Sequence, residues 1–249
     1  KIITGDLNKP KSYIDQLEQF RPDCCIHLAW SGLPDYSVEN SAKNLLAGIN
    51  LVKNLVETDC EKILIIGSCW EYGKMEGKVT ENVNPVSQNV FASFKTSLRI
   101  ISESICNGSN ASLLWGRAFF IYGPEQRSKA LIPLCYQSFK NGEKPKINNP
   151  LARNDFVYIS DVVNSIRVLV ESDDSSGIYN IGSGVSSPVW EVVNMVATEL
   201  GLPHPYKDMP ITLDSNFADM SKMKTHGWTP QFSLASGIES TVKFLERDS

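Results

Sequence analysis

The chain has 249 residues, of which 42% are hydrophobic and 21% are charged, and its formal net charge is -4. A chain of this length can bury a large core, as one α/β domain or as one domain with a small appendage. The charge balance gives no electrostatic reason to expect nucleic acid or an anionic membrane as a partner, and no apolar run approaches the length of a membrane span. We therefore expect a cytoplasmic protein that binds neither nucleic acid nor membrane.

Short apolar runs alternate with longer helical patterns along the first two thirds of the chain. The chain begins within an apparent strand at 1–4, and further buried strands are predicted at 24–30, 62–68, 111–123 and 177–184. Helices are predicted between them at 41–58, 92–106 and 162–171 from apolar residues at helical spacing. This alternation predicts a doubly wound parallel sheet, whose ligands bind at the carboxyl ends of the strands.

Two helical patterns show which face is expected to be buried. In the helix at 41–58 the apolar stripe consists of Leu45, Leu46, Ile49, Val52 and Leu55. After a stretch at 201–229 with weaker periodicity, a final helix at 234–246 places Ile238, Val242 and Leu245 on one face. We interpret the last third as a smaller lobe interleaved with the main sheet.

Six cysteines occur, none with C-x-x-C spacing: Cys24, Cys25, Cys60, Cys69, Cys106 and Cys135. Most lie within apolar runs, which favours reduced, buried thiols over a disulfide framework. The three histidines are far apart in the sequence and no carboxylates cluster near them, so no metal site is expected. An α/β hydrolase is also disfavoured, because no G-x-S-x-G elbow occurs.

The stretch NVFASFKTS at 89–97 contains a lysine one helical turn after an aromatic residue. Phe91 and Lys95 would share a helix face, and Ser68 ends a predicted strand, where a hydroxyl points into the ligand crevice of an open α/β sheet. Each residue has a structural alternative. Ser68 could cap the following turn, and Lys95 could lie on a solvated helix face.

Several segments together resemble the extended short-chain dehydrogenases/reductases of the nucleotide-sugar epimerase, dehydratase and reductase group. The similarity covers nearly the whole chain, and its segments are, in order, Gly5-Asp6-Leu7, His27-Leu28-Ala29-Trp30, the helix opening at Asn44, Gly67-Ser68-Cys69-Trp70-Glu71-Tyr72-Gly73, Phe91-Ala92-Ser93-Phe94-Lys95, Gly116 to Pro124, Asn154 to Asp161, Tyr179 to Gly184 and Gly227-Trp228-Thr229-Pro230. In this order the set is far more specific than any single segment.

The resemblance implies a site for NAD or NADP and for a nucleotide-diphosphate sugar. The implied catalytic positions are Ser68, Phe91 (where the family has tyrosine) and Lys95. The implied cofactor contacts are Asp6, Leu7, Leu28, Ala29, Trp30, Asn44, Gly67, Lys95 and Phe119. The implied substrate contacts are Ser68, Cys69, Trp70, Phe120, Arg127, Lys129 and Arg153.

Some of these substrate positions have a structural explanation that involves no ligand. Arg127 and Lys129 could be solvated loop charges. Arg153 stands near the usual phosphate-binding arginine of the family. Asn154, however, occupies the position immediately before Asp155, so the alignment of Arg153 with that arginine is left open. The resemblance also implies a dinucleotide-binding part at 1–125 and 155–184, a substrate-binding lobe at 126–154 and 185–249, and a homodimer that pairs through the helices at 41–58 and 92–106.

The sequence departs from the family pattern at its start. The glycine-rich dinucleotide turn is absent, and alignment through Gly5-Asp6-Leu7 implies two βα units, roughly 60 residues at about 30 per unit, ahead of residue 1. A sheet without its first two strands would expose an apolar edge. We therefore expect that a segment of the protein precedes this sequence; the alternative is a true truncation that cannot hold the dinucleotide normally.

The departures around Ser68 and Phe91 narrow the function. Dehydratases of the group carry Asp-Glu directly after the hydroxyl residue, where this chain has Cys69 and Trp70, so dehydration is disfavoured. Phe91 removes the phenol that exchanges a proton with the sugar, a loss that costs about 10²–10⁴ in rate. We favour reduction of a 4-keto-6-deoxy nucleotide sugar at an impaired or engineered site, with 4-epimerisation as one alternative and an inactive nucleotide-sugar-binding paralogue as another.

Overall fold

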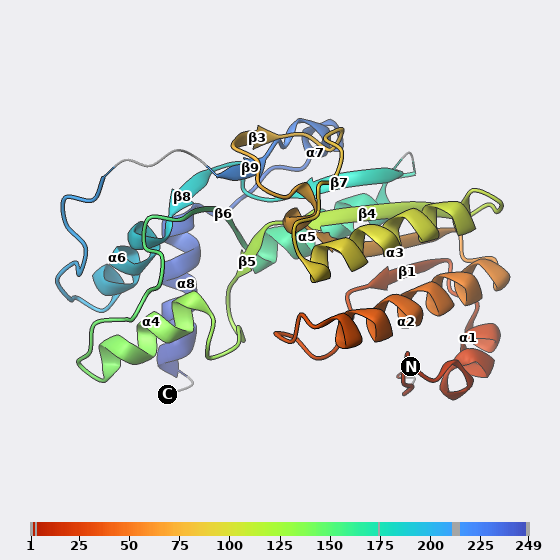
Figure 1. The fold of residues 1–249 in the computed structure, drawn as a ribbon, viewed down its shortest axis with the longest axis horizontal. Coiled ribbons are helices and arrows are strands. Elements are labelled where there is room, and N and C mark those ends of the chain that lie inside the picture. The colour runs from red at the N-terminus through yellow and green to blue at the C-terminus, as the bar shows by residue number, and fades with distance from the viewer. Residues whose placement is uncertain (1, 3, 174, 211–214, 248–249) are drawn as a thin grey trace. The chain divides into compact units, whose positions relative to one another are not determined.

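The computed structural model describes residues 2, 4–173, 175–210 and 215–247 (Figure 1). The chain divides into two compact units: unit 1 comprises 1–74, 81–118 and 166–179, and unit 2 comprises 75–80, 119–165 and 180–249. The predicted division into cofactor-binding and substrate-binding parts is a functional one and stays a prediction. By compactness alone, residues 75–80, 119–125, 155–165 and 180–184 of the predicted cofactor-binding part belong to unit 2.

Unit 1 contains a Rossmann-like sheet. Its elements begin with η1 (Pro10–Ser12), α1 (Ile14–Phe20), β1 (Cys24–His27), α2 (Val38–Glu57), β2 (Lys62–Ser68), η2 (Cys69–Tyr72), α3 (Val90–Cys106) and β4 (Ser112–Ala118). Among the described residues the strand order is β1-β2-β4-β7, with β7 at Gly177–Ile181, and the β1–β2 and β2–β4 pairs are parallel. The predicted parallel α/β fold is therefore confirmed.

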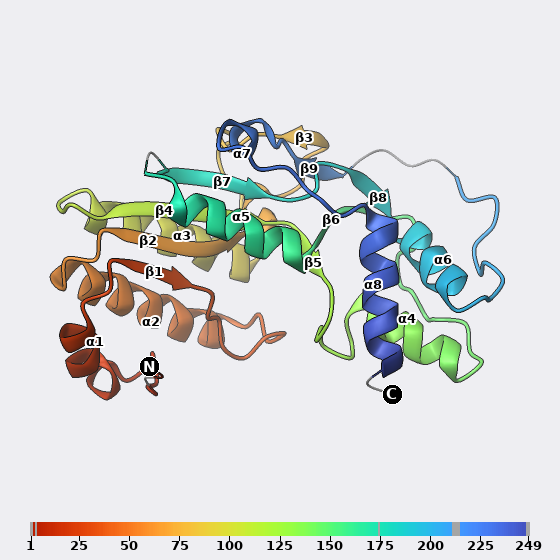
Figure 2. The same ribbon diagram turned by 180° about the vertical axis from the view of Figure 1, so that it is seen from behind.

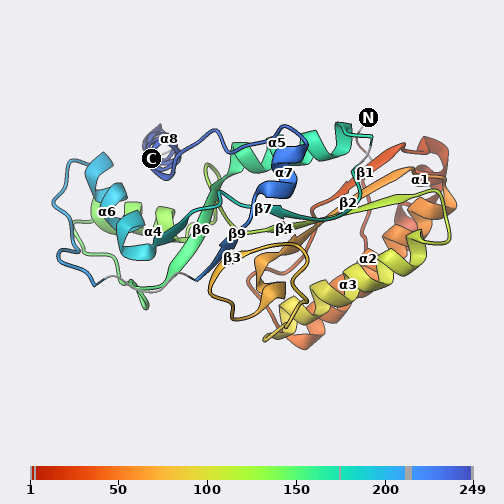
Figure 3. The same ribbon diagram turned by 90° about the horizontal axis from the view of Figure 1, so that it is seen from above.

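Helices cover both faces of this sheet, as a doubly wound fold requires. Helices α2 and α3 pack together on one face, and α5 (Ile159–Glu171), of which residues 166–171 belong to unit 1, lies on the other (Figures 2 and 3). Gly48 allows the close approach of α2 and α3, because a Cβ at this position would lie 2.9 Å from the methyl groups of Leu98. Side-chain oxygens cap both helices, Ser37 for α2 and Asn89 for α3.

Unit 2 carries smaller sheets and a helical layer. Its elements are β3 (Gly77–Val79), β5 (Phe120–Tyr122), α4 (Leu131–Lys140), β6 (Arg153–Tyr158), β8 (Ser186–Pro188), α6 (Val189–Glu199), β9 (Asn216–Ala218), α7 (Ser221–Thr225) and α8 (Leu234–Arg247). Helices α4, α6 and α8 share one core with β6, and Ile238 and Val242 of α8 are buried there as predicted. Buried Asp155 ties this unit together by accepting hydrogen bonds from Ser183, Gly184 and Ala218.

Some predicted details are wrong. The run at 111–123 is two strands, because the ladder between β2 and β4 ends at Ser68 and Ala118 and the chain then enters unit 2. Leu46 is 62% exposed, so it does not belong to the buried face of α2. Of the apparent strand at 1–4, Lys1 and Ile3 lie outside the described residues.

All six cysteines are free, as predicted, and four are buried; Cys24, however, is exposed and Cys25 only partly buried. Across the described part of the chain, no helix combines the length and the apolar character that crossing a membrane requires. Nor do the described residues include a group of three or more His, Cys, Asp or Glu placed to hold a metal ion.

Candidate active site

Ser68, Phe91 and Lys95 reach the same edge of the sheet in unit 1. Ser68 is the last residue of β2, and Lys95 lies one turn after Phe91 on α3. The ammonium of Lys95 donates a hydrogen bond of 2.8 Å to the carbonyl oxygen of Ile66, two residues before Ser68 on the strand. The structure thus brings together two segments that are well separated in the sequence.

Lys95 is buried, with 6% of its surface exposed, so the solvated-face alternative is wrong. Its Nζ lies 4.2 Å from the ring centroid of Trp30. Burial lowers the pKa of Lys95 to about 8, and the negative charge of Glu71 opposes part of this shift. A lysine in this pKa range changes its charge near neutral pH, which is typical of functional sites.

Four aromatic rings gather at position 91, and we call Trp30, Tyr36, Trp70 and Phe91 the aromatic cluster. The ring of Phe91 makes edge contacts with Trp30, Tyr36 and Trp70, at centroid distances of 5.2, 5.3 and 5.8 Å. Tyr36 also contacts Trp70, at 5.5 Å. Sequence reasoning missed Tyr36, because it lies on a loop outside every recognisable segment.

Ser68 caps η2, so its structural alternative is present in the fold. Its Oγ accepts a hydrogen bond of 3.2 Å from the backbone N–H of Trp70, and its own N–H donates to Glu71 Oε1 at 2.8 Å. This capping box fixes the position of the hydroxyl. The hydroxyl hydrogen is not used in this cap, so the Ser68 side chain keeps a donor for a substrate oxygen.

A buried ion pair lies against the end of β2. Glu71 and Arg117 are fully buried, and Arg117 Nε lies 3.1 Å from Glu71 Oε2. Trp115 Nε1 donates to both carboxylate oxygens of Glu71, at 3.0 and 3.2 Å. Gly67 is required here, because a Cβ would overlap Trp115 Nε1 and Glu71 Oε1. The charged residues in the runs at 67–73 and 111–123 were the only sequence signal for this network.

Asn44, a predicted cofactor contact, anchors the loop that follows β1. Its Oδ1 accepts from the backbone N–H of Ser31 at 2.7 Å, and its Nδ2 donates to the carbonyl oxygens of Ser31 and Asn40 at 3.1 and 2.9 Å. The predicted cofactor positions before residue 31 are more open, whereas Gly67 and Lys95 are buried. Asp6, Leu28 and Ala29 are exposed and Leu7 is partly buried. Their roles toward a cofactor stay predictions.

The remaining predicted ligands belong to unit 2. Phe119 is buried, and the ring of Phe120 packs on Phe156 at 6.0 Å. Arg127 and Lys129 are exposed in the loop before α4. Arg153 donates to Ser186 Oγ and to the Ser186 carbonyl oxygen, at 3.1 and 2.6 Å. Their roles as ligands stay predictions.

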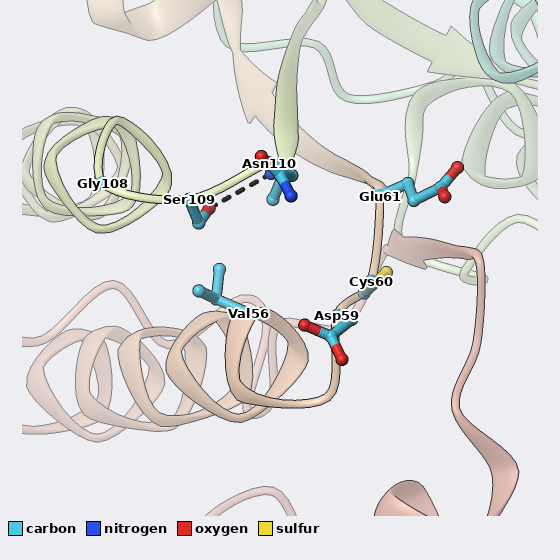
Figure 4. Close-up of a pocket in the computed structure, with 8 residues that line it drawn as sticks. Val56, Asp59, Cys60, Glu61, Gly108, Ser109 and Asn110 are labelled. Atoms are coloured by element: carbon cyan, nitrogen blue, oxygen red, sulfur yellow. Dashed lines mark hydrogen bonds between the residues drawn. The ribbon is translucent and has the colours of Figure 1, made fainter.

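A separate depression lies at the opposite end of the unit 1 sheet, where β2 and β4 begin (Figure 4). It is lined by Val56, Asp59, Cys60, Glu61, Gly108, Ser109, Asn110 and Ala111. None of the predicted site residues lines it, and in parallel α/β sheets ligands bind at the other, carboxyl edge.

His27, the last residue of β1, should make the free energy of unfolding depend on pH. Burial lowers its pKa to about 4, and the charge of Lys95 adds to the shift. Between pH 6.5 and 4 the unfolded chain binds a proton that the folded chain does not, so the free energy of unfolding falls as the pH falls, by about 3 kcal/mol in all. His27→Gln should flatten this part of a urea-denaturation pH profile, whereas His204→Gln, at an exposed position, should not. Equal slopes in both variants would contradict the assignment.

The chain is similar to one family of known proteins and to several of its members. Residues 1–182 match the family described as the NAD dependent epimerase/dehydratase family. The chain is 24% identical to the low-salt glycan biosynthesis protein Agl12 of Haloferax volcanii over 258 residues, which cover 100% of this chain and 83% of that protein. It is 29% identical to a dTDP-4-dehydro-6-deoxyglucose reductase of Escherichia coli over 238 residues, covering 88% and 74%.

The fold is similarly matched among solved structures. The UDP-glucose 4-epimerase of Thermus thermophilus, in complex with NAD, superposes with a TM-score of 0.85 at 22% identity and covers 98% of this chain and 84% of its own. Structural neighbours are complexed with NAD or with NADPH.

Proposed function

Because the chain belongs to the NAD-dependent epimerase/dehydratase family, we propose that it is an NAD(P)-dependent oxidoreductase that reduces the 4-keto group of a 4-keto-6-deoxy nucleotide sugar. The observation that carries this proposal is the position of Lys95, buried and bound to the Ile66 carbonyl beside the hydroxyl of Ser68. The relative that acts on a dTDP-4-dehydro-6-deoxy sugar supports the choice of substrate.

The hydrogen-bond donors at the carboxyl edge of the unit 1 sheet fit a hydroxyl-rich ligand such as the ribose of a dinucleotide. The Lys95 ammonium has three hydrogens, and the hydrogen bond to Ile66 uses one of them. Beside it, the indole N–H of Trp30 is buried and has no hydrogen-bond partner among the residues that the structure describes. A buried donor that lacks an acceptor costs stability unless a ligand satisfies it. The bound cofactor would supply the hydride.

The chain's own residues then have separable roles. Ser68 donates its hydroxyl hydrogen to the sugar's carbonyl oxygen and polarises that group. Lys95 holds the ribose and places a positive charge near the developing oxyanion. Cys69 and Trp70 stand where a dehydratase has its acid and base, and Cys69 is buried while Trp70 packs in the aromatic cluster. These two side chains offer no acid–base pair, which supports reduction over dehydration.

The proposal is tested with the full-length protein by following the absorbance of NADH and NADPH in the presence of dTDP- and UDP-linked 4-keto-6-deoxy sugars. Phe91→Tyr supplies a phenol whatever the wild-type proton source is, so this variant should oxidise the reduced cofactor. Adding Lys95→Met in the same background should lower the rate at least 100-fold, on the order of the loss of a general acid–base contribution.

If the wild-type protein and Phe91→Tyr both bind nucleotide sugar in calorimetry but neither oxidises the reduced cofactor with any keto sugar, the reductase proposal is overturned. That outcome would favour the inactive binding paralogue, for which Phe91 is the supporting observation. Interconversion of 4-epimers without net oxidation of cofactor would identify an epimerase instead.

A further inference from the structure

A phenol lies in direct ring contact with Phe91. Of the three rings that contact Phe91 in the aromatic cluster, Trp30 and Trp70 carry only indole N–H groups, while Tyr36 carries a hydroxyl. The centroids of Tyr36 and Phe91 are 5.3 Å apart and their planes meet at 68°. The side chain that position 91 lacks is therefore present in the same cluster, supplied by another segment.

We propose that Tyr36 is the general acid of the reaction and replaces the phenol that is absent at position 91. The inference rests on the proposed reductase function. A bound NADH or NADPH would supply the hydride that adds to the carbonyl carbon, and the C=O π pair would move to the oxygen. The oxygen takes the proton of the Tyr36 hydroxyl, giving the alcohol and a phenolate. Water then reprotonates the phenolate, which it can reach because Tyr36 is 38% exposed.

The backbone on both sides of Tyr36 is held in place. Asn40 Nδ2 donates to the carbonyl oxygens of Asp35 and Ser31, at 2.8 and 3.0 Å. Asp35 Oδ1 accepts from the N–H of Ser37 at 2.9 Å, and Ser37 Oγ accepts from the N–H of Asn40 at 3.2 Å. Tyr36 is thus fixed between two anchored neighbours, which is the support that a catalytic side chain on a loop requires.

The start of the same loop is equally constrained. Gly32 has a φ of +80°, and a Cβ there would lie 2.6 Å from the amide oxygen of Asn40. The loop therefore packs closely against the first turn of α2. Contacts with Phe91 and Trp70 hold the Tyr36 ring from the other side. Lys95 Nζ lies 5.8 Å from the Phe91 centroid, so the cation and the phenol border the same ring.

The test compares Tyr36→Phe with the wild-type protein in steady-state turnover of the 4-keto sugar. Removing the acid should lower kcat about 10²–10⁴-fold and leave KM nearly unchanged, because the ring contacts remain. The double variant Tyr36→Phe/Phe91→Tyr should recover most of the lost rate, since it returns a phenol to the cluster. Tyr13→Phe, which removes a phenol from the core of unit 1, should leave kcat unchanged.

Three results would overturn the proposal. Tyr36→Phe with wild-type kcat would show that the proton comes from Lys95 or water. Tyr36→Phe that stays inactive after Phe91→Tyr is added, although Phe91→Tyr alone is active, would indicate a structural role. If the wild-type protein were inactive and Phe91→Tyr were active, Tyr36 would not be the general acid, but the proposed reductase site would still be supported. Only inactivity of both proteins speaks against the reductase function itself.

Discussion

Glu71→Gln is expected to lower the free energy of unfolding by about 3–5 kcal/mol, the cost of leaving one member of a buried ion pair without its partner. Arg117 is fully buried and its guanidinium cannot lose its proton within a protein, so neutralising Glu71 leaves an uncompensated charge in the core. The measurement is urea denaturation followed by tryptophan fluorescence, since Trp115 donates to the same carboxylate.

Glu39→Gln is the matched control for this substitution. Glu39 also pairs with a cation, Lys43, at 2.7 Å, but their side chains are 81% and 62% exposed. An exposed pair contributes far less to stability than a buried one, because solvent screens both charges. Glu71→Gln/Arg117→Met should recover part of the loss, because it removes the stranded charge as well. Equal stability of Glu71→Gln and Glu39→Gln would contradict the role assigned to the buried pair.

Lys95→Met is expected to abolish turnover while raising stability at pH 7 by up to about 3 kcal/mol. Burial holds the pKa of Lys95 near 8 instead of 10.5, so the folded protein carries the cost of a desolvated ammonium at neutral pH. The lost hydrogen bond to Ile66 and the contact with Trp30 offset part of the gain. A site residue that destabilises the fold is expected where function requires its charge.

The pH dependence gives this prediction a second check. Between pH 8 and 10.5 the unfolded wild-type chain retains a proton that the folded chain has lost, so the wild-type free energy of unfolding rises with pH. Lys95→Met lacks this rise, and the stability difference should close over that range. Lys43→Met on the exposed side of α2 serves as the control and should show no such closing gap. A Lys95→Met variant that is less stable than wild type at every pH would contradict the burial argument.

Much of the parallel sheet was predictable because its strands are short apolar runs. The run at 62–68 is β2 without change, and the helix at 92–106 differs from α3 only at its first residues. Helix α6 was missed, although its residues are largely buried, because valine-rich segments read equally well as strand. Leu46 was assigned to the wrong face because a broad apolar stripe does not show where packing ends.

The sequence by itself determined the family pattern, the convergence of Ser68 with the helix of Lys95, and the missing hydroxyl of Phe91. The family pattern and the missing hydroxyl follow from the resemblance of several segments taken in order. The convergence follows from helical periodicity and from the rule that ligands gather at the carboxyl ends of parallel strands. Only the tertiary structure decided that Lys95 is buried, that Glu71 and Arg117 form an ion pair beneath the strand end, and that Tyr36 contacts Phe91. Burial and ring contacts depend on how distant segments pack, and a loop residue such as Tyr36 has no periodicity that could show its position beforehand.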